Sequence, residues 1–191
     1  MPHPPPLVRL PYMPTRIADT LALLGIAPAD IAARALKAHA EATELMVAEV
    51  GADGREFLLQ PNAAQAWRSM KIAAAGDGVT ILLGSAFRGV ARQAEIIREN
   101  LGEGRSLEDI LTSIAPPGYS EHHTGRAVDI VSDDVPDIDE AFEGTAAYAW
   151  LAANASRFGF VMTYPRGNMD GYVFEPWHWC YHAPRTDSAG E

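Results

Sequence analysis

The sequence has very little cysteine and a shortage of positive charge. Cys180 is the single cysteine among 191 residues, so no disulfide can form within the chain and no pair of cysteines can hold a metal ion. Any metal must therefore be bound by His, Asp or Glu. The 25 acidic residues outnumber the 15 basic ones and give a net charge of -10. Because proteins that bind nucleic acid usually present a basic face to the phosphates, we expect no DNA or RNA partner.

Long apolar runs are also missing. No uninterrupted run approaches the roughly 20 residues needed to cross a bilayer, so we expect no transmembrane segment. The first residues, MPHPPPLVRLPYMP, lack the apolar region of a secretory signal. This chain by itself therefore predicts a cytoplasmic protein, and the periplasm or the cell wall is the alternative.

The length predicts one domain. A chain of 191 residues that is 48% hydrophobic can bury one good core and is short for two domains of ordinary size. Residues 1–14 are rich in proline and predict an extended arm that leans on the domain formed by residues 15–191. We expect a monomer.

Hydrophobic spacing predicts an α+β fold. Helices are expected at residues 15–24, 30–50, 62–74, 90–101 and 145–157, with Asp30 as N-cap of the second and a short helix opened by a capping box at Ser106–Asp109. Strands are expected at residues 79–85, 126–131, 160–165 and 177–182. Because strands and helices do not alternate regularly, we expect a mainly antiparallel sheet with helices packed on one side.

Two histidines and an aspartate lie close together in the segment SEHHTGRAVD, residues 120–129. His122 and His123 stand on a loop hinged by Gly125, and Asp129 stands on the strand that follows, among small and apolar neighbours. A lone carboxylate there is costly unless it is paired or binds a metal. Only one of two adjacent histidines is expected to face the same point as Asp129.

The segment EPWHWCY, residues 175–181, holds a second cluster. In a strand, the aromatic residues share one face, which we expect in the core, and His178 shares the other face with Cys180. Pro176 cannot donate to a strand ladder, which frees Glu175 to turn toward His178. The segment therefore predicts a carboxylate base beside a histidine that can bind a metal.

Two histidines and one aspartate suit a catalytic zinc site. Three protein ligands leave the fourth tetrahedral position open for water, whereas a structural site is closed by a fourth ligand. Zinc lowers the pKa of water to about 7, and a nearby glutamate can accept the proton as this water attacks a carbonyl. The residues therefore predict amide hydrolysis with one Zn²⁺ per chain.

The two motifs resemble those of a known family. SEHHTGRAVD is similar to the pattern SxHxxGxAxD, and EPWH to the pattern ExWH, of the VanY-like zinc D-alanyl-D-alanine carboxypeptidases, which are relatives of the lysostaphin and hedgehog-type metallopeptidase fold. The likeness covers about residues 60–182. It implies that His122, Asp129 and His178 bind zinc and that Glu175 is the general base.

A third segment, SAFRGVARQ, resembles the family element SGYRSxxxQ. The resemblance implies that Arg88 acts in catalysis and substrate binding and that Gln93 contacts the same carbonyl or terminal carboxylate of a peptidoglycan-derived peptide. Ser120 is expected to contact the substrate or to shape its loop. Two positions depart from the family: Phe87 replaces a tyrosine, and Cys180, which we expect in buried packing, stands where an arginine is common.

The sequence therefore predicts a zinc-dependent carboxypeptidase that hydrolyses the D-alanyl-D-alanine bond of peptidoglycan precursors or muropeptides. The remaining histidines, His3, His39, His123 and His182, are expected to be structural or at the surface. Two alternatives stay open: a peptidoglycan endopeptidase with the same site, and a non-catalytic binding module stabilised by zinc. Glu175 argues against the module, because a structural site needs no base.

Overall fold

The computed structural model describes residues 7–9, 17–34 and 36–183. The α-helices are α1 (Ile17–Leu23), α2 (Pro28–Ala33), α3 (Pro61–Gly76), α4 (Val90–Gly102), α5 (Leu107–Ile110) and α6 (Ala146–Asn154). The 3₁₀ helices are η1 (Glu121–Thr124), η2 (Glu140–Gly144) and η3 (Ala155–Phe158). The strands are β1 (Leu7–Arg9), β2 (Glu44–Val50), β3 (Glu56–Leu59), β4 (Leu82–Ser85), β5 (Ala127–Val131), β6 (Phe160–Met162) and β7 (His178–Tyr181).

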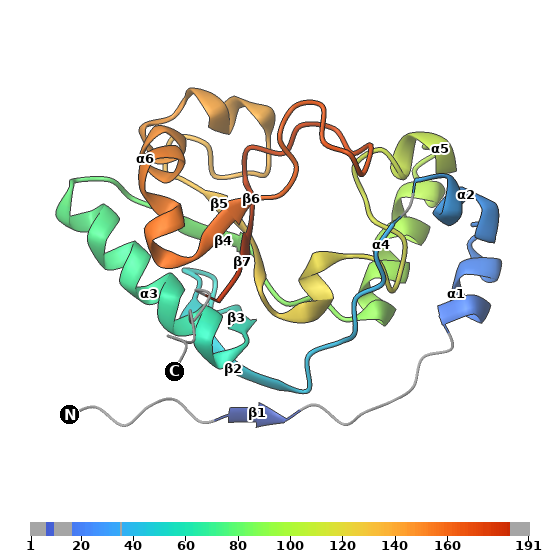
Figure 1. Ribbon diagram of the computed structural model, residues 1–191, viewed down its shortest axis with the longest axis horizontal. Coiled ribbons are helices and arrows are strands. Elements are labelled where there is room, and N and C mark those ends of the chain that lie inside the picture. Colours follow the sequence, from blue (N-terminus) through green and yellow to red (C-terminus); the bar gives the residue numbers. More distant parts are fainter. Residues whose placement is uncertain (1–6, 10–16, 35, 184–191) are drawn as a thin grey trace, which may run out of the picture.

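The strands form two antiparallel sheets (Figure 1). One sheet has three strands in the order β1-β2-β3, and the other has four in the order β4-β5-β7-β6. All neighbouring pairs in both sheets run antiparallel. The expectation of an α+β fold with a mainly antiparallel sheet is confirmed.

Helices α3 and α6 pack with both sheets in the main hydrophobic core. Trp67 of α3 is fully buried, and its indole nitrogen donates a hydrogen bond to Glu49 of β2 at 2.9 Å. Phe160 of β6 and Leu151 of α6 are also fully buried. This core fixes the four-stranded sheet, whose central strands β5 and β7 carry two of the expected metal ligands.

A second, smaller core lies among α1, α4 and α5, which gather on the opposite side of the molecule from α3 and α6 (Figure 1). Leu21 of α1, Ile97 of α4 and Ile110 of α5 are buried in it. The segment between α5 and η1 connects this core to the sheet. The main core therefore fixes the four-stranded sheet, and the smaller core fixes α4. Residues that lie between the sheet and α4 are held from both sides.

The expectation of one helix over residues 30–50 is wrong. Helix α2 ends at Ala33, and residues 44–50 form β2, the central strand of the three-stranded sheet. Met46 of β2 packs in the main core. Leu45 lies on the other face of the strand, next to Gly125. A strand buried on both faces gives a nearly continuous apolar run, which periodicity cannot separate from a buried helix.

Asp30 is not the N-cap of a helix. Pro28 occupies the first turn of α2 with Ala27 as N-cap, and the Asp30 carboxylate accepts a hydrogen bond from the Ala27 N–H at 2.9 Å. Proline suits the first turn because its fixed φ matches the helix and its missing N–H has no helical partner. The other expected elements are found, but the strands expected at residues 79–85 and 160–165 are shorter, as β4 and β6. Ser106 caps α5 as expected, accepting a hydrogen bond from the Asp109 N–H.

Of the proline-rich segment, only residues 7–9 are described, and they form β1, which pairs with the edge of β2. The remaining residues of the predicted arm lie outside the described ranges. The division at residue 14 stays a prediction. Among the described residues, no helix is both long enough and apolar enough to span a membrane.

Candidate active site

The 3₁₀ helix η1 presents two adjacent histidines in different directions. It ends at Gly125, whose φ of 64° lies in the left-handed region. A Cβ at this position would lie 2.8 Å from Leu45 Cδ2 and 3.1 Å from the backbone nitrogen of Gln60, so a larger residue does not fit without movement. Gly125 therefore allows η1 to turn tightly into β5 against the three-stranded sheet.

His122 and His123 make different contacts. The Nδ1 of His122 lies 2.7 Å from the Ala86 carbonyl oxygen, and its Nε2 faces Asp129. Both nitrogens of His123 have backbone partners: the Gly118 N–H donates to Nε2 at 3.0 Å, and Nδ1 lies 2.6 Å from the Arg88 carbonyl oxygen. His122 is thus free to bind a metal through Nε2, while His123 ties two loops together.

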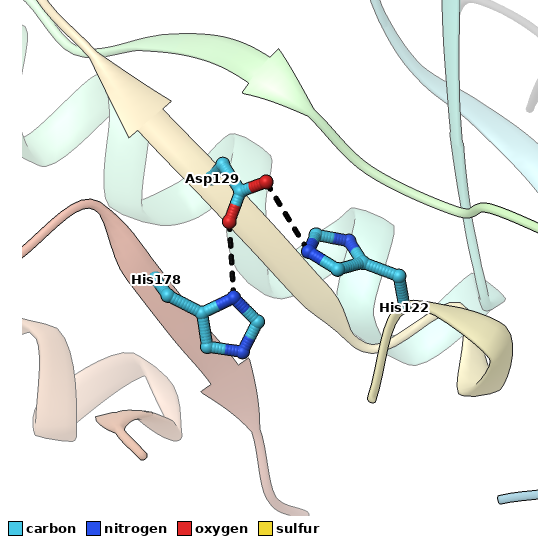
Figure 2. A group of neighbouring side chains, drawn as sticks. All are labelled: His122, Asp129 and His178. Carbon is cyan, nitrogen blue, oxygen red and sulfur yellow. Dashed lines mark hydrogen bonds and ion pairs between the residues drawn. The ribbon is translucent and has the colours of Figure 1, made fainter. Parts of the chain in front are cut away.

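Asp129 lies between the two histidines that the sequence assigns as ligands (Figure 2). On β5 it is paired with Ser85 of β4 and His178 of β7. One carboxylate oxygen lies 3.2 Å from His122 Nε2, and the other lies 3.0 Å from His178 Nδ1. The structure therefore brings together the three predicted ligands, His122, Asp129 and His178, and all three are buried.

His178 is held from three sides. Its Nδ1 faces Asp129, and its Nε2 lies 3.0 Å from a carboxylate oxygen of Glu121. The ring of Tyr164 stacks on the imidazole, with centroids 4.6 Å apart and an interplanar angle of 24°. Thr163, the residue before Tyr164, donates a hydrogen bond to the same Glu121 oxygen at 2.7 Å. The contacts leave the His178 ring little freedom to rotate.

His178 lies between two carboxylates, those of Asp129 and Glu121, and the three groups shift one another's pKa values. Burial acts to raise the pKa of Asp129, but the two facing histidines hold it well below its usual range. Burial acts to lower the pKa of His178, but hydrogen bonds to Asp129 and Glu121 raise it to about 10. Burial acts to raise the pKa of Glu121, but hydrogen bonds from His178 and Thr163 lower it to about 2. The two carboxylates therefore favour a positive charge at this point of the site, which is the proton on His178 when no metal cation supplies it.

The three ligands fit a zinc ion. Zinc binds His nitrogen and carboxylate oxygen at about 2.0–2.2 Å, so ligand atoms at tetrahedral corners lie roughly 3.3 Å apart. The two separations to Asp129, one to each of its carboxylate oxygens, are close to this size, and one ligand atom from each of the three residues can be chosen so that all lie within 4.8 Å of one another. Each histidine also offers its outward nitrogen to a carbonyl or carboxylate acceptor, which is how metal-bound histidines are usually held.

Glu175 lies in the turn before β7. Its N–H donates to the Tyr164 carbonyl oxygen at 3.1 Å, and its own carbonyl accepts from the His178 N–H at 3.0 Å. Only 6% of its surface is exposed, and burial raises the pKa of its carboxyl group to about 7. The expectation that Pro176 lets Glu175 turn out of the strand agrees with this position, because β7 begins only at His178.

A cleft of about 410 Å³ connects these groups. Its lining includes the three candidate ligands with Glu175, and also Arg88, Gln93 and Ser120, the residues expected to contact a substrate. Burial lowers the pKa of the Arg88 guanidinium, whose Nη2 lies 4.0 Å from Asp129 and whose Nε is buried without a hydrogen-bond partner. Gln93 donates through Nε2 to the Ala115 carbonyl at 2.6 Å, and its buried Oε1 has no partner.

Two residues of the site, Glu121 and Tyr164, were not among the sequence candidates. Glu121 immediately precedes the predicted ligand His122, and this position was the one signal in the sequence. Its carboxylate, however, contacts His178, 57 residues further along the chain. Tyr164 stood in an expected strand, where nothing indicated a ring against His178. Cys180 is buried as expected, His39 is half-buried, His182 is exposed, and His3 lies outside the described residues.

Comparisons with known proteins agree with this site. The VanY family, described as D-alanyl-D-alanine carboxypeptidase, matches residues 56–184. The YodJ protein of Bacillus subtilis (strain 168) is 33% identical over 157 residues, which cover 77% of this chain and 56% of that protein. This chain thus spans little more than half the length of that relative.

Solved structures give the same result. The LdcB LD-carboxypeptidase is 32% identical, with a TM-score of 0.64, and the match covers 74% of this chain and 69% of that one. A mutant of the vancomycin resistance D,D-pentapeptidase VanY in complex with Zn(II) is 29% identical, with a TM-score of 0.56 and coverage of 76% and 80%. The family match extends over most of the chain and includes every residue of the candidate site. The chain belongs to the VanY family of D-alanyl-D-alanine carboxypeptidases.

Proposed function

We propose that this chain is a zinc-dependent D,D-carboxypeptidase that removes the last D-alanine from peptidoglycan precursors or muropeptides. The observation that carries the proposal is the convergence of His122, Asp129 and His178 in one cleft with the buried carboxylate of Glu175. Family membership supports the D-alanyl-D-alanine substrate, and the Zn(II) complex of VanY supports the metal.

The three ligands hold the metal, and Glu175 moves the proton. Zinc, when bound, supplies a Lewis acid that polarises water and the scissile carbonyl. Glu175 accepts a proton from the attacking water and delivers it to the leaving amine, so its carboxyl group must change protonation state within the cycle. Its burial suits this work, since a desolvated carboxyl group has a pKa close to neutral pH.

Arg88 and Gln93 offer complementary contacts to a peptide. The buried Nε of Arg88 is a donor without a partner, which suits a carboxylate or a carbonyl oxygen of the substrate. The unpartnered Oε1 of Gln93 is an acceptor and suits an amide N–H, while its Nε2 is already engaged by the Ala115 carbonyl. Through Oε1, Gln93 therefore offers an acceptor to an amide N–H of the peptide, and the second N–H of its Nε2 remains a donor on the same side chain as that acceptor.

A second candidate substrate comes from the LdcB likeness, because that protein is an LD-carboxypeptidase with a TM-score of 0.64 to this chain. Both reactions release a terminal D-amino acid, but they differ in the configuration of the residue before it. The same zinc site and the same Arg88 serve either bond. The choice between the D,D and the L,D reaction then depends on the wall of the cleft that contacts the residue before the terminal D-amino acid.

Mass spectrometry of muropeptide digests tests the proposal. The zinc-loaded protein should convert a pentapeptide stem to a tetrapeptide and free D-alanine, and the Glu175→Gln variant should release almost none. Cleavage of a tetrapeptide stem alone would favour the L,D reaction, and larger fragments would indicate an endopeptidase. No cleavage of any stem by zinc-loaded protein would overturn the proposal in favour of a binding module.

A further inference from the structure

The two histidines of the site present opposite ring nitrogens to Asp129. His122 faces the carboxylate with Nε2, and its Nδ1 is bonded to the Ala86 carbonyl. His178 faces it with Nδ1, so its Nε2 points away from the metal position (Figure 2). A histidine can bind a metal through Nδ1 only if that nitrogen carries a lone pair, which in the neutral ring puts the proton on Nε2.

The acceptor for that proton is Glu121. We propose that Glu121 is a positioning residue of the metal site, which acts by accepting the Nε2–H of His178 and so keeps Nδ1 directed at the metal. The distance from Nε2 to the Glu121 oxygen is 3.0 Å. This role depends on the metal site proposed above.

Glu121 is itself fixed in place. Thr163 donates a hydrogen bond to the same oxygen at 2.7 Å, and the Glu121 side chain is only 15% exposed. Its backbone belongs to η1, the element that also carries His122. Movement of η1 would therefore displace one ligand directly and the other through Glu121, so the two histidines are coupled across the sheet.

Glu121 is poorly placed to be a fourth ligand. Its oxygen contacts the ring nitrogen of His178 that lies away from Asp129, and the set of described residues whose ligand atoms converge includes His122, Asp129 and His178 without Glu121. The carboxylate lies behind the histidine, as in the carboxylate–histidine–metal arrangement that orients metal ligands in many sites.

Zinc affinity of the full chain, measured by chelator competition, tests this role. Glu121→Ala should weaken zinc binding about 10- to 100-fold, the usual effect of removing an outer carboxylate. Glu121→Gln should bind more tightly than Glu121→Ala, because its amide oxygen can still accept the Nε2–H bond. Thr163→Val should weaken binding by a smaller factor. Glu140→Gln, at an exposed position of η2, is the matched control and should bind as the native chain does.

Thermal unfolding of the metal-free variants separates positioning from general stability. If Glu121 acts by positioning, Glu121→Ala should bind zinc more weakly even where the metal-free variant remains folded. A loss of affinity that only follows a loss of metal-free stability would indicate a general structural role. Native affinity in Glu121→Ala, or equal weakening in Glu121→Gln and Glu121→Ala, would overturn the role. If Glu121→Ala fails to fold, Glu121→Leu, which cannot accept the Nε2–H bond, replaces it, and native zinc affinity in Glu121→Leu would overturn the role. Absence of zinc binding by the native chain would instead refute the proposed function.

Discussion

His122 and His123 are neighbours in the chain with different chemical surroundings. His122 directs one nitrogen at Asp129, whereas both nitrogens of His123 are engaged by backbone groups. A histidine whose two nitrogens are already bonded has no lone pair to offer a metal. At the scale of single residues, hydrogen bonding rather than position in the motif therefore separates a candidate ligand from a structural histidine.

This difference predicts the metal content of two variants. His178→Ala removes a ligand and should reduce bound zinc from about one per chain to a small fraction, because two protein ligands hold zinc weakly. His123→Ala should keep about one zinc per chain while lowering the melting temperature, since it breaks one buried and one part-buried hydrogen bond. Elemental analysis of folded, dialysed protein measures both. Equal zinc loss in the two variants would contradict the ligand assignment.

Glu175→Gln isolates the proton transfer. The amide keeps the shape of the side chain but cannot accept the proton, so turnover should fall by at least about a hundredfold. Zinc content should stay at the native level, because Glu175 is not among the converging ligand atoms. Single-turnover hydrolysis of a muropeptide together with metal analysis checks both expectations. Near-native turnover would show that another group serves as the base.

The sequence could predict the three candidate ligands, which the structure brings together, because they lie in two motifs whose residue types suit zinc. It could not identify Glu121 as a partner of His178, because that contact joins η1 to β7 and depends on how the sheet is built. The same limit applies to Gln93, whose residue type suggested a donor to a carboxylate. Only the structure places its Nε2 against the Ala115 carbonyl and leaves Oε1 free.

At the scale of elements, the sequence was most informative where one face of an element is exposed. Helix α3 and helix α4 were predicted close to their observed ends, since each is polar on one side and has a recognisable stop. For β2 the sequence predicts a helix, because its apolar run includes residues buried on both faces of the strand, Leu45 on one and Met46 and Ala48 on the other. Such a strand lacks the alternation that would identify it.

The turn at the end of η1 connects this sheet to the metal site, which leads to a prediction for Gly125→Ala. The new Cβ would be 2.8 Å from Leu45 Cδ2 on β2, and φ of 64° is strained for alanine. We expect a loss of about 2–4 kcal/mol in free energy of unfolding, from strain and crowding together. Because η1 carries His122, the stabilisation by zinc should also fall.

Gly104→Ala is the matched control for that change. Its φ of 90° is also positive, but an added Cβ would meet nothing within 4 Å. This variant should lose only the cost of backbone strain, about 1–2 kcal/mol, and should keep the full stabilisation by zinc. Thermal unfolding of both variants with and without zinc makes the comparison. If zinc stabilised Gly125→Ala as much as it stabilises the native chain, the geometry of η1 would not matter for metal binding, and the prediction would be wrong.

At the scale of the whole molecule, the cleft lies between two hydrophobic cores. The main core supports β5 and β7 with Asp129 and His178, and the smaller core supports α4, which contributes Gln93 to the opposite wall. Arg88 lies in the link between β4 and α4, where the two supports meet. The net charge of -10 disfavours anionic ligands at long range, so the half-buried guanidinium of Arg88 must provide the local attraction for a carboxylate.

That position of Arg88 separates an exopeptidase from an endopeptidase. A carboxypeptidase must recognise a free terminal carboxylate, and a charge-assisted hydrogen bond to it is commonly worth about 1.5–3 kcal/mol. Amidating the terminal carboxylate of the substrate should therefore reduce kcat/KM of the native enzyme about 10- to 100-fold. In Arg88→Ala the same amidation should have much less effect. Arg92→Ala, which alters an exposed arginine paired with Glu95 and Glu99, should keep the native sensitivity. Equal cleavage of amidated and free-acid peptides by the native enzyme would mean that Arg88 does not read a carboxylate, and an endopeptidase would then be the better description.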